Sequence, residues 1–366
     1  MINMPSLRFA EFVEKWEPKD FVEIVDVRNG QDYKHLSEGN IPVYGTGGYM
    51  TSVNEALSYE DDAIGIGRKG TIDKPQLLRA PFWTVDTLFY AVPKSGYDLD
   101  FVFDLFQNVD WKKKDESTGV PSLSKTAINA VNVCVPRLNE QRQIGRLLTE
   151  IDCMITAQQQ KYEKLVALKS ACLEKMFPKE GDRIPVLRLT GYSSEWKKNK
   201  VGKVCSISTG KSNTQDRVND GLYPFYVRSA IVERSNRYLF DEEAVLTVGD
   251  GVGTGKVFHY VNGKYDLHQR VYRMFDFTDE ITAKFFYYYF SKYFYKRVMS
   301  MTAKTSVDSV RMEMISDMDI LYPSDREEQR KIAAILSCID DLIALQQHRM
   351  EKLERFKQAM RHSMFV

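Results

Sequence analysis

The segment of the sequence that comes closest to a catalytic or nucleotide-binding motif is Gly249–Lys256, which reads GDGVGTGK. A phosphate-binding loop needs GxxxxGK followed by Ser or Thr, because its backbone amides cradle the phosphates and the hydroxyl binds Mg²⁺. Here Asp250 stands in place of the first loop glycine, and Val257 stands in place of the hydroxyl residue. The segment is therefore not predicted to bind a nucleotide.

Other patterns that carry chemistry are missing from the sequence as well. It has no Asn-Pro-Pro-aromatic motif like that of adenine methyltransferases and no GxGxxG after a predicted strand. The five histidines are not spaced like metal ligands, and the five cysteines never form CxxC. We therefore expect no catalytic site, no metal site, no cofactor and no disulfide framework.

Glycine-rich segments occupy similar places in the two halves of the chain, each after a predicted strand. The counterpart of Gly249–Lys256 is Gly65–Gly70, which reads GIGRKG. Glycine permits close approach of the backbone, so both segments could lie against nucleic-acid phosphates, with Arg68, Lys69 and Lys256 as cation donors. An ordinary hairpin turn explains the same composition, and the sequence leaves both interpretations open.

Polar and cationic residues near the predicted loop tips could read bases. Arg suits guanine, Asn or Gln suits adenine, and small hydroxyl or apolar groups suit thymine, because each matches the groups on that base edge. Taken singly, each candidate is more often a solvated loop residue, but as a set they should be enriched at an interface. Candidates in the first half are Tyr44, Thr46, Tyr49, Arg68, Lys69, Thr71, Ser122 and Lys125. Those in the second half are Tyr226, Arg228, Ser229, Asp250, Lys256, His268, Gln269, Arg270, Lys304, Ser306 and Arg311.

The charge of the chain restricts how it could bind DNA. The net charge is +1, with 14 basic and 20 acidic residues over 1–136 and 21 basic and 17 acidic residues over 182–323. Phosphate contacts need cations, so any basic surface must be local or supplied by a partner. The runs Lys112–Lys114 and Lys197, Lys198, Lys200 and Lys203 are plausible phosphate contacts, although charge runs usually mark a solvated face.

The elements that must position these residues occur twice along the chain. GluGlnArgGlnIle at Glu140–Ile144 returns as GluGlnArgLysIle at Glu328–Ile332, a shift of 188 positions. Each half keeps its ends and varies its middle, which predicts two related domains. At a shift of 180 positions, Pro5, Leu7, Arg8, Phe9, Phe12, Trp16 and Gly30 recur as Pro185, Leu187, Arg188, Leu189, Tyr192, Trp196 and Gly210.

The variable middles, residues 20–136 and 200–323, have the composition of mixed α/β domains. Short β-branched and aromatic runs alternate with Gly, Asn, Asp and Pro, which is the pattern of strands and turns. We expect one helix late in each middle. The expected strands include Phe21–Val27, Leu88–Val92, Ala244–Val248 and Val271–Phe275, and the expected helices are Leu99–Asn108 and Thr282–Met299.

Each middle is followed by about 40 residues with almost no Gly or Pro and with apolar residues at heptad spacing. We expect two long helices, each about 60 Å long, that pair in antiparallel orientation. Gln158 and Gln346 fall at matching positions and would fix the register. The alternative is two amphipathic helices that each pack only on their own domain. The expected interface is Ile144, Leu148, Ile151, Ile155, Gln158 and Leu165 with Ile332, Leu336, Ile339, Ile343, Gln346 and Leu353.

These features together resemble the specificity subunits of type I restriction-modification systems. The resemblance rests on the opening PxLRF...W, on its repeat PVLRL...W, and on the P...EQ[RK][QK]I entrance to each long helix, and it covers essentially the whole chain. It implies an α+β fold in which two target-recognition domains, related by an internal repeat, are joined by two long antiparallel helices. The expected domains are 1–136 and 181–323, and the expected spacer helices are 137–180 and 324–366.

The resemblance also implies a function without catalysis. Such a subunit binds one asymmetric, two-part sequence in double-stranded DNA. It recruits two methyltransferase subunits, to which the endonuclease and translocase subunits attach. No apolar run is long enough to span a membrane and the start does not resemble a signal peptide, so we expect a cytoplasmic protein. The remaining alternative is a coiled-coil adaptor whose domains bind proteins.

Overall fold

The computed structural model describes residues 4–251, 253–301 and 309–366. The chain divides into two compact units: unit 1 is Met1–Gln160 with Gln347–Val366, and unit 2 is Lys161–Gln346. Each unit holds one mixed α/β domain and one segment of each long helix, α4 (Leu138–Met176) and α8 (Arg326–Met364). No helix within the described ranges is both long and apolar enough to cross a membrane.

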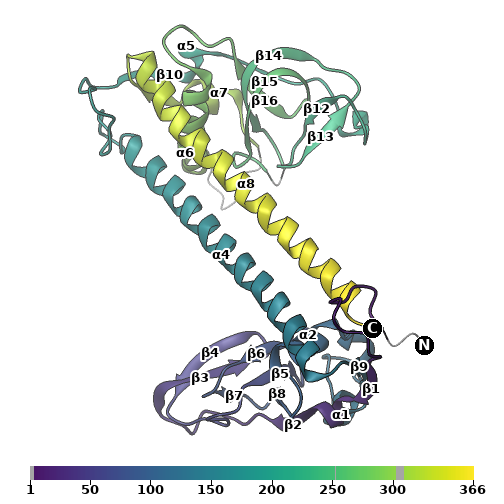
Figure 1. Ribbon diagram of the computed structural model, residues 1–366. Coiled ribbons are helices and arrows are strands. Elements are labelled where there is room, and N and C mark those ends of the chain that lie inside the picture. The colour runs from purple at the N-terminus through teal and green to yellow at the C-terminus, as the bar shows by residue number, and fades with distance from the viewer. Residues whose placement is uncertain (1–3, 252, 302–308) are drawn as a thin grey trace. The chain divides into compact units, whose positions relative to one another are not determined.

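The first domain, in unit 1, is built from three small sheets and short helices (Figure 1). The strand orders are β1-β9, β2-β8-β5-β6 and β4-β3-β7, and all neighbours are antiparallel except β3 and β7. The strands are β1 (Glu17–Asp20), β2 (Val25–Asn29), β3 (Glu38–Gly45), β4 (Gly48–Val53), β5 (Ala63–Gly67), β6 (Gln76–Leu78), β7 (Trp83–Thr84), β8 (Leu88–Pro93) and β9 (Asn132–Val135). The helices are α1 (Phe21–Ile24), α2 (Leu99–Asn108), η1 (Trp111–Lys114) and α3 (Lys125–Asn129).

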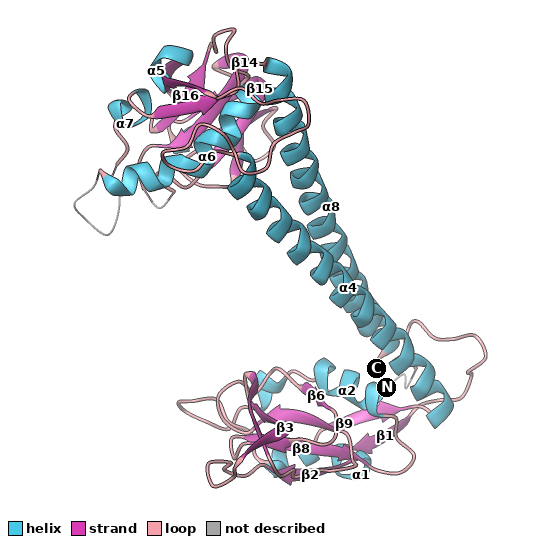
Figure 2. Cartoon of the chain, turned by 90° about the vertical axis from the view of Figure 1, so that its left-hand side faces the viewer, coloured by secondary structure: helices cyan, strands magenta, loops and turns pink. Residues whose placement is uncertain are grey.

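The second domain, in unit 2, has a similar order of elements and one larger sheet (Figure 2). Its six-stranded sheet runs β11-β16-β14-β15-β12-β13, and β10 pairs with β17. The strands are β10 (Lys197–Lys200), β11 (Ser206–Thr209), β12 (Tyr223–Tyr226), β13 (Val232–Ser235), β14 (Phe240–Val248), β15 (Phe258–Leu267), β16 (Val271–Phe275) and β17 (Asp319–Tyr322). The helices are α5 (Val201–Val204), η2 (Thr214–Asp216), α6 (Ala283–Ser300) and α7 (Met312–Ser316).

Most of the predicted elements are confirmed, but the strand predicted over Phe21–Val27 is wrong in its first half. Phe21–Ile24 form the short helix α1, and β2 begins only at Val25. Asp20 and Glu23 form a capping box, in which the Asp20 amide donates to the Glu23 carboxylate at 3.1 Å. A capped helical turn therefore prevails over the β propensity of Phe21 and Val22.

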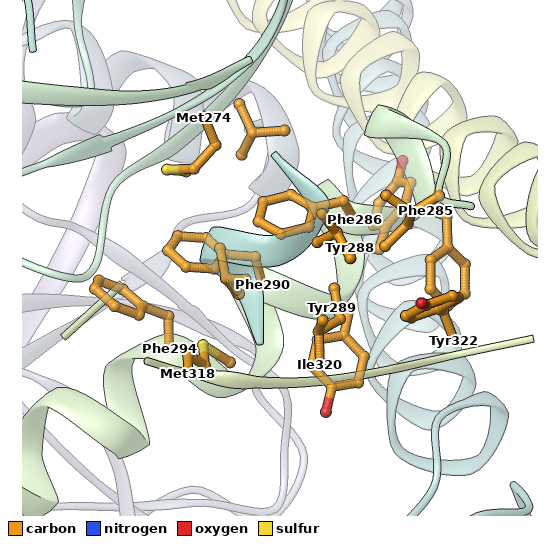
Figure 3. Packing of buried hydrophobic residues seen from close by; sticks show 14 of the residues in the cluster. Met274, Phe285, Phe286, Tyr288, Tyr289, Phe290, Phe294, Met318, Ile320 and Tyr322 are labelled. Carbon is orange, nitrogen blue, oxygen red and sulfur yellow. The ribbon is translucent and has the colours of Figure 1, made fainter. Parts of the chain in front are cut away.

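Each domain core is completed by both long helices. In unit 1, Trp16 and Phe101 pack with Ile144 from the start of α4 and with Phe365, which directly follows α8. In unit 2, the aromatic face of α6 packs with Ile332 and Leu336 of α8 and with Met176 and Phe177 at the end of α4. Figure 3 shows the α6 aromatic residues of this core. The helices are thus not independent surface helices on separate domains.

Within each unit the two helix segments run antiparallel (Figure 1), and one ion pair joins them. In unit 1, Lys357 donates to Asp152 at 2.6 Å, and in unit 2, Lys169 lies 2.5 Å from Asp340. Both the lysines and the aspartates are separated by 188 positions, which is the shift of the repeat. The two ion pairs are therefore equivalent, and each fixes the same helix register in its own unit.

Candidate nucleic-acid interface

The repeated signature residues form scaffold contacts rather than a site. The Arg8 guanidinium donates to both carboxylate oxygens of the buried Glu140, at 2.6 and 2.7 Å, and Arg188 binds the buried Glu328 at 2.8 and 3.0 Å. The Glu140 carboxylate raises the pKa of Arg8. Each motif therefore ties the opening segment of its domain to the first turn of a long helix.

The glutamine that follows each of these glutamates connects the late helix of its domain to the same junction. The Asp98 amide, at the N-cap of α2, donates to the Gln141 side chain at 3.0 Å, and the Gln141 amide group donates to the Pro136 carbonyl at 2.8 Å. In the second domain, the Thr282 amide donates to Gln329 at 2.8 Å. The signature therefore explains the common scaffold and leaves the loops free to differ.

Several of the predicted binding residues lie at one edge of each domain, where the loop after β5 or β14 meets the segment before α3 or α7, and we call this the loop edge. Strand pairing relates the two loop edges, because Gly67 pairs with Leu88 and Val248 pairs with Val271. By this register Lys69 corresponds to Asp250. Two isolated bridges agree, since Lys69 bridges Ser122 and Asp250 bridges Ser309. The loop after β5 or β14 thus meets the segment before α3 or α7 in both domains.

The loop edge of the first domain contains a groove of about 920 Å³. Four of the predicted residues line it: Arg68, Lys69, Ser122 and Lys125. The backbone holds them in place, because the Arg68 amide donates to Thr87 at 2.8 Å and the Leu123 amide donates to Arg68 at 2.9 Å. Asn29 and Phe89 also line the groove, and neither could be predicted from the sequence, because both stand at strand positions.

The wall of this groove is a loop organised by Asp115. Its carboxylate accepts from the Ser117 amide and hydroxyl at 3.0 and 2.8 Å and from the Ser122 amide at 2.9 Å. These hydrogen bonds stabilise the charged form and lower the pKa of Asp115. The loop is therefore preformed, and its exposed residues Thr118, Gly119 and Val120 form one side of the groove.

The other first-domain candidates lie in or near the β3–β4 hairpin and the β5–β6 loop. Tyr49 is exposed, and its ring meets that of Tyr44 edge-on at 6.5 Å. Tyr44 itself is half-buried against the core. The hydroxyl of Thr46 lies 3.7 Å from the point where a Cβ of Gly70 would be, so the hairpin tip meets the β5–β6 loop. Thr71 is half-buried in that loop.

The loop edge of the second domain is centred on Asp250. Nη1 of Arg228 lies 3.5 Å from Oδ1 of Asp250, and Nε of Arg270 lies 3.7 Å from Oδ2. The side chains of the two arginines are 50% and 65% exposed, whereas that of Asp250 is 27% exposed. Three predicted residues thus form one cluster in which a partly buried carboxylate faces two outward guanidinium groups.

His268 and Gln269 belong to the turn beneath this cluster. His268 is 4% exposed, and its Nδ1 accepts from the Arg270 amide at 3.0 Å. Burial and the neighbouring Arg228 lower its pKa, so the neutral ring is favoured. The structure therefore gives His268 a role in holding Arg270 and leaves its ring without access to a base. Gln269 is exposed and donates to Asn213 at 2.5 Å.

The remaining second-domain candidates are more dispersed. Tyr226 is half-buried and packs on His259 and Tyr265, so it belongs to the sheet. Ser229 is exposed, and Lys256 is exposed over the ring of Tyr295 at 5.0 Å. Arg311 is exposed and directly follows Val310, whose amide donates to the Gly249 carbonyl at 2.7 Å. The predicted contacts Lys304 and Ser306 lie outside the described residues.

Both glycine-rich segments join antiparallel strands. Gly249–Lys256 leads from β14 into β15 without an intervening helix, so it does not have the architecture of a nucleotide-binding loop. The lysine runs are largely paired with acidic groups, because Lys112 lies 2.8 Å from Asp73 and both Lys198 and Lys200 contact Asp319. In the described ranges, His, Cys, Asp and Glu form no group of three able to hold a metal ion.

Some of the predicted helix-pair residues are buried in a domain core, and the others lie along the helices outside the cores. Ile144, Leu148 and Ile151 are buried in the first core, and Ile332 and Leu336 in the second. Ile155 packs partly buried against the first core, and Ile339 and Gln346 are buried in unit 2. Gln158, Leu165, Ile343 and Leu353 are half-buried. The sequence did not predict the partners of Lys169 and Lys357, since an ion pair across helices depends on the register.

Comparison with known proteins agrees with this architecture. The family model described as Type I restriction modification DNA specificity domain matches residues 13–167 and 193–355. A crystal structure of a type I restriction-modification system S subunit from M. genitalium has 15% sequence identity, covers 99% of both chains and has a TM-score of 0.80, so it has the same fold.

Two named relatives match parts of the chain. The type I restriction enzyme EcoDI specificity subunit of Escherichia coli is 28% identical over 170 residues, covering 45% of this chain and 37% of that protein. The MjaVIII specificity subunit of Methanocaldococcus jannaschii is 25% identical over 272 residues, covering 67% and 64%. The match spans less than two thirds of either relative. Because the family model covers most of both halves, this chain belongs to the type I restriction-modification DNA specificity domain family, with two copies of the domain.

Proposed function

We propose that this chain is the DNA sequence-specificity subunit of a type I restriction-modification complex. Each domain reads one half of an asymmetric, two-part site in double-stranded DNA through its loop edge, and the helix pair sets the number of unread bases between the halves. The observation that carries this proposal is that two equivalent loop edges on a repeated scaffold present different side chains. Lys69 in the first domain corresponds to Asp250 in the second.

The chemistry of the loop edges supports DNA as the ligand. Their exposed groups are cations, hydroxyls and amides, including Arg68, Lys69, Lys125, Arg228 and Arg270. Such groups match phosphates and base edges. The cations are few, and residues 1–136 carry 14 basic and 20 acidic residues, so most of the non-specific attraction to DNA would come from partner subunits. We therefore expect the isolated chain to bind DNA weakly, with a shallow dependence on salt.

Equivalent exposed apolar residues on the two units support two copies of one protein partner. Met154 and Phe356 in unit 1 correspond to Leu342 and Leu168 in unit 2 by the 188-position shift, and all four are exposed. Contiguous apolar patches on a protein surface often mark protein interfaces, and we propose that each pair belongs to such a patch. By family resemblance, the partners are two methyltransferase subunits, through which the restriction and translocase subunits attach. The chain itself would direct chemistry and perform none.

The test is to produce the chain with its cognate methyltransferase subunit and to sequence the host DNA for methylated bases. We expect one two-part motif whose halves are separated by a fixed number of unread bases. The chain alone and the methyltransferase alone serve as controls, and neither should methylate the motif. Methylation by the chain alone would contradict a non-catalytic role. A stable complex that leaves no motif would contradict the specificity role.

A further inference from the structure

The Arg228–Asp250–Arg270 cluster has a geometry that distinguishes the second domain from the first. By strand register, Arg228, Asp250 and Arg270 correspond to Thr46, Lys69 and Thr87. The first domain therefore has one cation where the second has two cations around a carboxylate. Since the scaffold is shared, we attribute this difference to the ligand that each loop edge recognises.

The cluster is built on fixed backbone. The Arg270 amide donates to His268 at 3.0 Å, and the Arg270 carbonyl accepts from the Gly249 amide at 2.8 Å. A Cβ on Gly253 would lie 3.0 Å from the Arg228 carbonyl, so the β14–β15 connection packs directly on Arg228. The backbone of both arginines is thus held in place. Their side chains extend into solvent, with the Asp250 carboxylate between them.

The carboxylate makes the cluster a poor phosphate site and a good base reader. A phosphate approaching either arginine would also approach Asp250, which carries the same sign of charge and cancels part of the attraction. The guanine edge in the major groove is neutral and offers two acceptors, O6 and N7, to which an arginine fork donates in bidentate fashion. Because both guanidinium groups contact one carboxylate, they can address only one base pair or neighbouring base pairs.

We infer that the second domain reads guanine through Arg228 and Arg270, that Asp250 is the positioning residue that aims them, and that the first domain does not use this arrangement. The inference rests on the proposed function and deepens it. It predicts at least one G·C pair in the half-site of the second domain.

Conservative variants distinguish base reading from phosphate binding. Lysine keeps the charge of arginine but lacks its planar fork. In the complex with the methyltransferase, we expect Arg228→Lys or Arg270→Lys to reduce the preference for one G·C pair about tenfold. Asp250→Asn should relax the same position less, without weakening total DNA binding, because it removes a negative charge. Lys69→Gln is the matched control in the first domain and should leave this half-site unchanged.

The outcomes separate this inference from the proposal on which it rests. An unchanged motif in both lysine variants means that these arginines do not read guanine, and it would overturn the inference. A motif in which the half-site of the second domain lacks any G·C pair would overturn it as well. In both cases the specificity role stands, because the wild-type complex still gives a two-part motif. A wild-type complex without any motif would overturn both. Normal methylation of the other half-site shows that each variant is folded.

Discussion

The loop edges of the two domains differ far more than the scaffold that carries them. At the shared junctions, Arg8–Glu140 and Arg188–Glu328 make the same bidentate contact. At the loop edges, a groove lined by Arg68, Lys69 and Lys125 stands in place of the Arg228–Asp250–Arg270 cluster. The contrast shows that the repeat preserves the residues that hold the elements together, while the residues at the strand ends are free to diverge.

The largest expected effect on stability comes from removing the buried glutamates Glu140 and Glu328 of the shared scaffold. Glu140→Ala and Glu328→Ala should each destabilise their own domain by about 3–5 kcal/mol, because each leaves a guanidinium without its buried partner. Glu140→Ala should cost about 1 kcal/mol more, because Trp16 also donates to Glu140, at 3.3 Å. Hydrogen exchange of peptides from each domain during urea unfolding measures the free energy of unfolding of that domain. Destabilisation of only one domain across both variants would break the equivalence of the junctions.

A buried carboxylate in the first domain predicts a difference in pH dependence. Burial raises the pKa of Asp104 on α2 to about 7, although the positive charges of Lys357 and Arg361 lower it in part. At the matching position of α6 stands Tyr288, whose hydroxyl donates to Asp340 at 2.8 Å. Folded Asp104 keeps its proton up to about pH 7, whereas the unfolded side chain loses it near pH 4. The stability of the first domain should therefore fall as pH rises between these values.

The size of this effect should be on the order of 2–4 kcal/mol, and Asp104→Asn should abolish it. The chain has four tryptophans, and three of them, Trp16, Trp83 and Trp111, lie in the first domain. In a Trp196→Phe background, tryptophan fluorescence therefore follows unfolding of the first domain alone. Tyr288→Phe is the control and should leave the pH profile intact. An equal slope in the Asp104→Asn variant would show that Asp104 does not control the profile.

The cationic groove of the first domain should respond to the loss of one charge. In the complex, Lys69→Gln should weaken DNA binding roughly fivefold near 0.15 M salt and reduce the slope of log K against log salt by about 1, if Lys69 neutralises one phosphate. Titration at several salt concentrations measures both quantities. Lys113→Gln is a suitable control, because Lys113 is engaged with Asp110 at 3.0 Å. Equal effects of the two variants would show a general loss of charge.

The smallest expected effect concerns the two equivalent helix ion pairs. Lys357→Met should cost more than Lys169→Met, because the Lys357 side chain is 12% exposed and that of Lys169 is 29% exposed. Partly exposed pairs contribute up to about 1 kcal/mol. Double-mutant cycles with Asp152→Asn and Asp340→Asn measure the two coupling energies. A larger coupling for Lys169 would reverse the expected order.

Repetition and heptad spacing made the architecture predictable from the sequence. Both long helices lie where heptad spacing placed them, and the late helices α2 and α6 and strand β16 lie where residue composition placed them. Asp20 and Glu23 show what propensity alone misses, since a capping box between these two residues prevailed over a β-type run. The contacts around Asp250 could not be predicted from the sequence for another reason. Its partners Arg228 and Arg270 lie 22 and 20 residues away along the chain, and only the strand register brings them together.

The participation of Phe365 in the core of the first domain has a consequence for biosynthesis. A ribosome makes Trp16 and Phe101 first, then the entire second domain, and only afterwards Met364 and Phe365, which complete the first core. The second domain waits for much less of the chain, because Met176 and Phe177 precede it and its α8 core residues, Ile332, Ala333 and Leu336, follow it directly. Two domains that are equivalent by sequence repeat therefore mature in opposite order to their synthesis: the one translated first is the last whose core can close.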